Sequence, residues 1–74
     1  MPMIETVIVE QLRRASVSGK NVKIRYGWPK QKKQDVILKS GAGIGTKSVC
    51  GWVVDDPGTH NEIPFQLILS VFLV

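Results

Sequence analysis

The chain has 74 residues, 43% of them hydrophobic and 22% charged, with a formal net charge of +4 at pH 7. This length is that of one domain, and the apolar fraction is higher than in disordered chains. One cysteine excludes an intrachain disulfide, and no apolar run reaches the roughly 18 residues of a membrane-spanning helix. The lone thiol and the lack of a signal-peptide pattern predict a cytoplasmic protein.

The first predicted element is a helix over residues 3–17. Apolar residues recur there every three or four positions and form one stripe. The stripe consists of Ile4, Val7, Ile8, Leu12 and Ala15. Acidic residues lie early in this segment and arginines lie late, which suits the helix dipole, and Gly19 follows as a stop signal.

From residue 21 onward the apolar period changes to two, which predicts strands. Val22 and Ile24 alternate with basic residues, so we expect a half-buried strand over residues 21–28. Two more strands are predicted over residues 35–39 and 46–54. A lysine-rich turn precedes the first of these strands, and a flexible loop with three glycines precedes the second.

The segment of residues 62–74 is predicted as one further strand, apolar on both faces after Gln66. Its β-branched and aromatic residues favour a strand over a helix. Such a strand is covered on both sides or belongs to two sheets, and a small domain has little material for the cover. We therefore expect burial against a second copy of the chain. The expected homo-oligomer interface is Ile68, Leu69, Val71, Phe72 and Val74.

The order of one helix and then four to five strands predicts a mainly β fold in a single domain over residues 1–74. The helix occupies residues 3–17, and residues 21–74 form a small Sm-like β-barrel of four to five strongly bent antiparallel strands. A barrel removes open sheet edges, which explains how so short a β chain is stable alone.

Five segments of the chain resemble the WYL domain, a small Sm-like β-barrel of bacterial transcriptional regulators and defence-associated proteins. These segments read LRRASVSGK, NVKIRY, QDVILKS, VCGWVV and IPFQLILSV. The resemblance implies the barrel fold. The family's Trp-Tyr-Leu string is absent, GWVV stands in its place, and Ile68 and Leu69 occupy the region of an expected basic residue. The ligand-binding positions of the family are therefore not matched.

The charges are unevenly distributed along the chain. All ten basic residues lie between Arg13 and Lys47, where Asp35 is the only acid, so this stretch carries +9 and the flanks carry −5. A basic side of this kind is typical of proteins that bind polyanions. The predicted polyanion-binding residues are Lys23, Arg25, Trp28, Lys30, Lys32, Lys33, Lys39 and Lys47. The alternative is a solvated strand face with a lysine turn that promotes solubility.

Aromatic and reactive side chains are predicted to be mostly structural. Tyr26 is expected in the core and Trp52 in the core or at an interface. Trp28, at a strand end, is expected to be half-exposed, where it would stack on unpaired bases. Cys50 is expected to be a buried, unreactive thiol, because a cysteine nucleophile needs a nearby base and His60, the one histidine, lies in a polar turn ten residues on.

No residue pattern predicts catalysis, a metal site or a cofactor. Asp55 and Asp56 fit a turn, and the glycine loop matches neither of the common phosphate-binding patterns. Two functions remain. The first is a non-enzymatic module, regulatory in role, that binds single-stranded nucleic acid or a nucleotide-like polyanion. The second is a homo-oligomeric assembly module that uses the apolar C-terminal strand.

Overall fold

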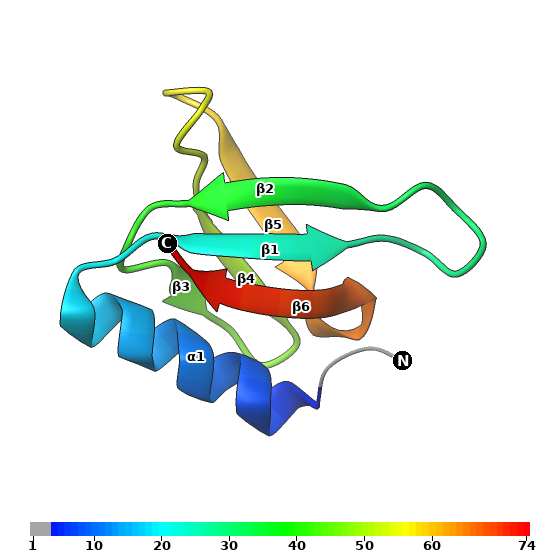
Figure 1. The fold of residues 1–74 in the computed structure, drawn as a ribbon, viewed down its shortest axis with the longest axis horizontal. Helices are drawn as coiled ribbons and strands as arrows, with labels where there is room; N and C mark the ends of the chain where they lie inside the picture. Colours follow the sequence, from blue (N-terminus) through cyan, green and yellow to red (C-terminus); the bar gives the residue numbers. More distant parts are fainter. Residues whose placement is uncertain (1–3) are drawn as a thin grey trace.

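One helix and six strands in two antiparallel sheets make up the fold of the computed structural model, which describes residues 4–74 (Figure 1). Sheet A has the strand order β2–β1–β6, and sheet B has the order β3–β4–β5. The elements in chain order are α1 (Glu5–Ser18), β1 (Val22–Tyr26), β2 (Gln34–Leu38), β3 (Gly43–Ile44), β4 (Ser48–Trp52), β5 (His60–Pro64), the 3₁₀ helix η1 (Phe65–Leu67) and β6 (Ile68–Leu73). The predicted helix followed by strands is confirmed.

Helix α1 confirms the predicted helix, although its predicted first residue lies outside the described residues. The buried members of its apolar stripe are Ile8, Leu12 and Ala15, which pack in the core. Ile4 and Val7, also predicted for the stripe, are exposed. The helix ends where Gly19 adopts the left-handed region at φ 68°, and the next amide, Lys20 N–H, donates to the carbonyl of Ala15 (2.9 Å).

Strand β1 is the centre of sheet A and pairs with a neighbour on each side. Val22 and Ile24 are buried while Lys23 and Arg25 are exposed, as the alternation of the sequence predicts. β2 joins β1 through a hairpin, whereas β6 arrives from the far end of the chain. A bulge shifts the β1–β6 register between Arg25 and Tyr26.

The prediction of one strand over residues 62–74 is wrong. The chain forms β5 in sheet B, turns through η1, and continues as β6 in sheet A. The turn breaks the alternation, so that Phe65, Leu67 and Ile68 are all buried. Of the two explanations for a segment that is apolar on both faces, membership in two sheets is the one observed.

The predicted glycine-rich loop contains β3, a short strand that pairs with β4. Gly51 of β4 is buried beneath this segment, and a Cβ atom at its position would lie 3.1 Å from the Cβ of Ala42. The glycine therefore allows the two chain segments to approach closely. The β4–β5 pairing is regular through Gly51, with no bulge there.

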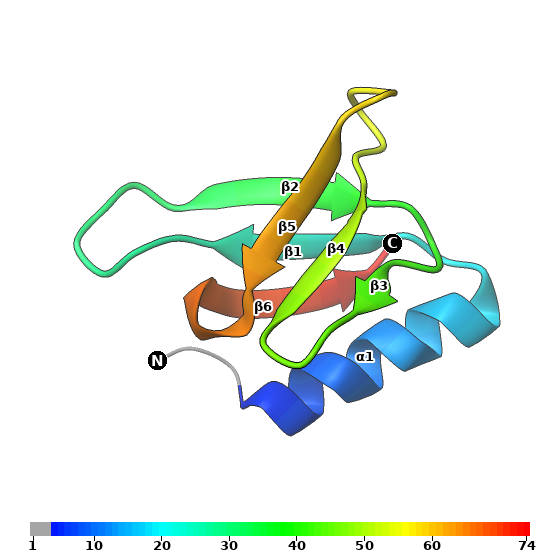
Figure 2. The ribbon, with the colours of Figure 1, turned by 180° about the vertical axis from the view of Figure 1, so that it is seen from behind.

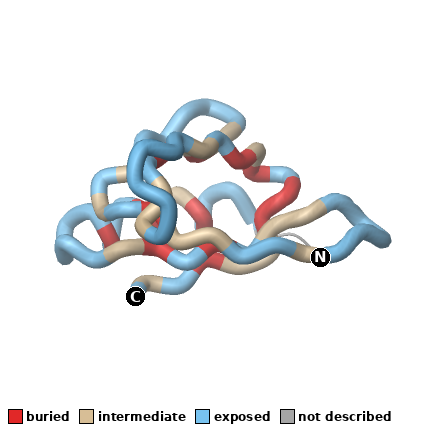
Figure 3. Tube along the Cα trace, turned by 90° about the horizontal axis from the view of Figure 1, so that it is seen from above, coloured by how far each residue is buried: buried red, intermediate tan, exposed pale blue. Residues whose placement is uncertain are grey.

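The core lies between the two sheets, whose strands cross steeply, and α1 packs against β6 and η1 (Figure 2). The buried residues of the core come from every element except β3: Ile8, Leu12, Ala15, Val22, Ile24, Leu38, Val49, Ile63, Phe65, Ile68 and Val71. Figure 3 shows these buried segments gathered in the middle, with the exposed turn between β1 and β2 projecting from the body. Within residues 4–74, no helix has the length and hydropathy that a bilayer-spanning segment requires.

Candidate functional site

The outer face of sheet A, which points away from the core, carries the two basic residues of β1. Lys23 and Arg25 reach this face because their neighbours in the alternation point into the core. The register with β6 places Phe72 beside Lys23 and Ser70 beside Arg25. With Asp35 from β2, these residues line one shallow depression of about 250 Å³.

Phe72 is the residue of this face that the sequence assigned to a different role. Its side chain is 61% exposed, and its cross-strand partner is Lys23. The pairing joins residues that are far apart in the sequence, so no local pattern indicates it. The ring stands directly beside a basic side chain rather than in a separate interface.

The basic residues of the outer face have no carboxylate partner at ion-pairing distance. Arg25 and Asp35 are register partners across β1 and β2, yet they form no salt bridge. Among residues 4–74 the one pair within 4.0 Å is Arg14 with Glu10 on α1, at 3.4 Å. Lys23 and Arg25 therefore form no ion pair, and Asp35 shares their face as the register partner of Arg25.

The β1–β2 turn (residues 27–33) extends this basic surface. Pro29 and Lys30 are its central residues, and Gln31 N–H donates to the carbonyl of Trp28 (3.2 Å). Lys30 has φ 67°, the left-handed value that the third position of a type II turn requires and that glycine usually supplies. Trp28 is 52% exposed, which confirms its predicted half-exposure. Lys30 and Lys32 are exposed at the tip.

Lys33 differs from the other lysines of the turn. Its ammonium donates a hydrogen bond to the backbone carbonyl of Trp28, which also accepts from Gln31. The side chain lies over Gly27, where an added Cβ atom would stand 3.0 Å from its Cδ. Lys33 therefore braces the turn, while Lys30 and Lys32 are free to meet an anion.

Two of the predicted polyanion-binding residues lie away from the β1–β2 turn. Lys39 follows β2 at the end of sheet A remote from the β1–β2 turn. Lys47 lies between β3 and β4, where it lines a depression of about 520 Å³ with Glu5 and Gln66. The eight predicted residues are thus not one site, because Lys47 lies away from the outer face of sheet A.

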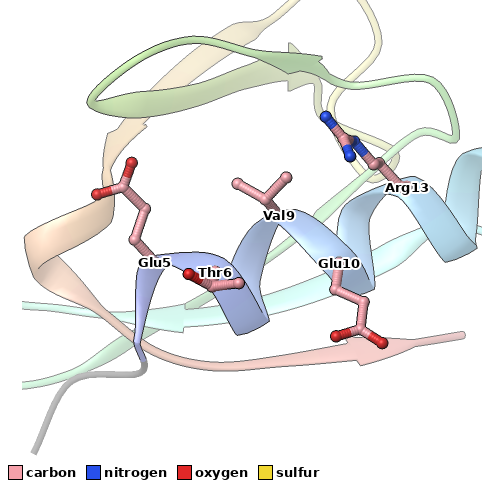
Figure 4. Close-up of a pocket in the computed structure, with 5 residues that line it drawn as sticks. All are labelled: Glu5, Thr6, Val9, Glu10 and Arg13. Carbon is pink, nitrogen blue, oxygen red and sulfur yellow. The ribbon is translucent and has the colours of Figure 1, made fainter.

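A further depression of about 450 Å³ runs along α1. Its lining residues are Glu5, Thr6, Val9, Glu10 and Arg13. Figure 4 shows Glu5, Val9 and Arg13 projecting to one side of the helix, with Glu10 on the other. Opposite charges separated by an apolar side chain do not suit a polyanion, and no two titratable groups converge here for acid–base work.

The predicted oligomer interface is partly buried within this chain. Ile68 is 0% and Val71 4% exposed, and both belong to the core described above. These two residues are therefore unavailable to a second copy while the chain is folded. Leu69 is half-buried at the β1–β6 bulge, and only Phe72 and Val74 are exposed.

Three further predictions on sheet B need correction. Trp52 is 53% exposed, so it does not lie in the core, and its position at an interface stays a prediction; its ring is edge-on to His60 at a centroid distance of 5.0 Å and an angle of 76°. His60 begins β5 instead of lying in a turn, and Cys50 is half-buried. No group of three metal-ligating side chains converges within residues 4–74.

Comparisons with known proteins found no family model, curated protein or solved structure that matches this chain. The function is therefore argued from the chemistry of the surface.

Proposed function

We propose that the protein is a non-enzymatic module that binds single-stranded nucleic acid through the outer face of sheet A and the β1–β2 turn. The observation that carries the proposal is the exposed ring of Phe72 beside Lys23 and Arg25, two cations without a carboxylate partner. Bases of a single strand stack on aromatic rings, and its phosphates attract the basic side chains.

A single strand fits this surface better than a duplex does. The base faces of a duplex are hidden within its stack, so an exposed phenyl ring finds no partner there. α1, the only long helix of the described chain, packs its apolar stripe into the core and is not presented to a groove. A sheet face with an exposed ring beside basic side chains is typical of single-strand binding.

The number of phosphate contacts follows from the side chains that are free. Lys23, Arg25, Lys30 and Lys32 are exposed and unpaired, whereas Lys33 holds the turn. Four contacts on a single strand predict that log K falls with log salt with a slope of about −3.

We also propose that the two sheets are the halves of a small Sm-like barrel. An isolated antiparallel bridge between Leu38 and Val53 links the sheets at one corner. η1 carries the chain from β5 back to β6, which pairs with β1. These connections support the barrel that the WYL resemblance implies, without extending that family's ligand to this chain.

The test is a fluorescence anisotropy titration with a labelled single-stranded 12-mer at 50 and 200 mM salt. We expect the affinity to fall about fifty-fold between the two salts. Lys23→Gln with Arg25→Gln should weaken binding strongly. The matched control, Arg13→Gln with Lys47→Gln, removes the same charge away from the outer face and should bind almost as the parent does. Binding that is absent at 50 mM salt, or equal in both double variants, overturns the proposal.

Light scattering on the same samples measures the oligomeric state and so tests the competing assembly function. Phe72 and Val74, 61% and 55% exposed, are the apolar side chains that β6 and the residue after it leave to solvent. A concentration-dependent oligomer that Phe72→Lys disperses, together with no binding of the 12-mer, would replace nucleic-acid binding by self-association.

A further inference from the structure

The outer face of sheet A does not end at β2. Around the Leu38–Val53 bridge, Lys39 N–H donates to the carbonyl of Trp52 (2.9 Å), and Val54 N–H donates to the carbonyl of Ile37 (2.8 Å). Residues 52–54 therefore continue the sheet beyond β2, and Figure 2 shows the end of β2 meeting the chain that follows β4.

This continuation brings exposed side chains from both sheets onto one surface. Leu38 is fully buried, so its neighbours Ile37 and Lys39 point to the outer face. Across the Leu38–Val53 bridge, Trp52 is the partner of Lys39 and Val54 is the partner of Ile37, and both point to the same outer face. Trp52 therefore lies beside Lys39. On its other side Trp52 pairs with His60, the residue that its ring contacts edge-on.

We propose that Trp52, supported by His60, is a second stacking site for the single strand that binds at Phe72. The inference rests on the proposed function and defines the path of its ligand, which crosses the strands from β6 toward β4. Lys23 lies on this path beside Phe72, and Lys39 lies on it beside Trp52. Both basic residues would hold phosphates between the two stacked bases.

The path sets a minimum ligand length. From β6 to residues 52–54 the sheet makes three strand-to-strand steps of about 4.8 Å, or about 14 Å. At the 3.4 Å rise of a stacked strand, this distance is about four steps, which join about five nucleotides. A dinucleotide therefore reaches one ring only, whereas a hexanucleotide reaches both.

Acidic residues determine where the path ends. Glu62 is two residues after His60 on the exposed face of β5, and Asp55 and Asp56 lie in the β4–β5 turn, which precedes His60. These carboxylates repel phosphates beyond Trp52. The site at Trp52 therefore takes a base, and the strand leaves the protein there.

The experiment compares a dinucleotide and a hexanucleotide on the full chain and on Trp52→Ala. We expect Trp52→Ala to lower the affinity for the hexanucleotide about tenfold and to leave the dinucleotide unchanged, whereas Phe72→Ala lowers both. Trp52→Phe, which retains a ring, should restore most of the hexanucleotide affinity. The hexanucleotide should also quench more tryptophan fluorescence in the parent than in Trp52→Phe, where Trp28 is the one remaining tryptophan.

The outcomes separate this inference from the proposed function. If the hexanucleotide binds with steep salt dependence and Trp52→Ala binds it as the parent does, the second stacking site is wrong and the proposed function stands. Loss of hexanucleotide affinity in Trp28→Ala but not in Trp52→Ala would show that the strand stays on the β1–β2 turn and does not cross to Trp52, which also overturns the path. If no oligonucleotide binds at 50 mM salt, both fail. Equal binding of polyglutamate would show a protein-binding surface and overturn both as well.

Discussion

The two turns that project from the body are built alike but carry opposite charge (Figure 1). In the β4–β5 turn, Thr59 donates from its amide (3.0 Å) and its hydroxyl (2.7 Å) to Asp56, and Gly58 takes the left-handed conformation at φ 94°. In the β1–β2 turn the left-handed residue is Lys30. The acidic turn thus uses the residue that the backbone favours, and the basic turn does not.

This difference concerns the backbone strain that each turn contains. A non-glycine residue in the left-handed region costs about 1 kcal/mol, and strain of this kind is concentrated at binding sites. Glycine at Lys30 would relieve the strain but remove a charge from the tip of the basic surface. On the proposed function, the conformation of Lys30 places its charge at the tip of the basic surface.

The largest effect on single-strand binding is expected when the basic turn loses its charges. Lys30→Gln with Lys32→Gln should weaken single-strand binding about tenfold at 50 mM salt and reduce the salt slope by about 1.4, because two phosphate contacts are lost. Anisotropy titrations over a range of salt concentrations measure both quantities. An unchanged slope would show that neither lysine contacts a phosphate.

Replacing the left-handed residue of each turn should have a smaller effect. It should change the free energy of unfolding in opposite directions in the two turns. Lys30→Gly should raise the free energy of unfolding by about 0.5–1 kcal/mol while it weakens binding, because strain is relieved and a charge is lost. Gly58→Ala should lower the free energy of unfolding by about 1–2 kcal/mol without a change in affinity. Thermal unfolding detects such changes as shifts of several degrees in a domain of this size. Full affinity in Lys30→Gly would mean that its strain serves no ligand.

The smallest expected effect comes from the acidic turn. Asp55→Asn with Asp56→Asn should tighten hexanucleotide binding about two- to threefold at low salt, because repulsion beyond Trp52 is weakened. The asparagine at position 56 retains an oxygen that accepts from Thr59, so the turn itself is preserved. The gain should vanish above about 0.5 M salt, and weaker binding in this variant would contradict the repulsion.

Local patterns predicted the parts of the fold that local interactions determine. The helix followed from the spacing of Ile8 and Leu12, and β1 followed from the alternation of Val22 and Ile24, since both periods depend on neighbours along the chain. The division of residues 62–74 was missed, because apolar residues continue through η1 and hide the change of phase. Pro64, where β5 ends, was the available signal.

The candidate site was predicted only where its residues share a strand. Lys23 and Arg25 were placed on one face by alternation alone. Phe72 and Trp52 join that face through strand pairings between distant segments, which no periodicity in the sequence encodes. Lys47 was grouped with the site by proximity in sequence, although the fold separates it.

β6 links the ligand surface to the folding equilibrium. Ile68 and Val71 fill the core, while Phe72, next along the strand, is the proposed stacking ring, so the ring is in place only when the core is closed. A ligand present at a hundred times its Kd would then stabilise the closed chain by about 2.7 kcal/mol. Against a total stability of about 4–11 kcal/mol for this length, that gain is large. The survival of the protein among proteases would therefore follow the supply of single strands.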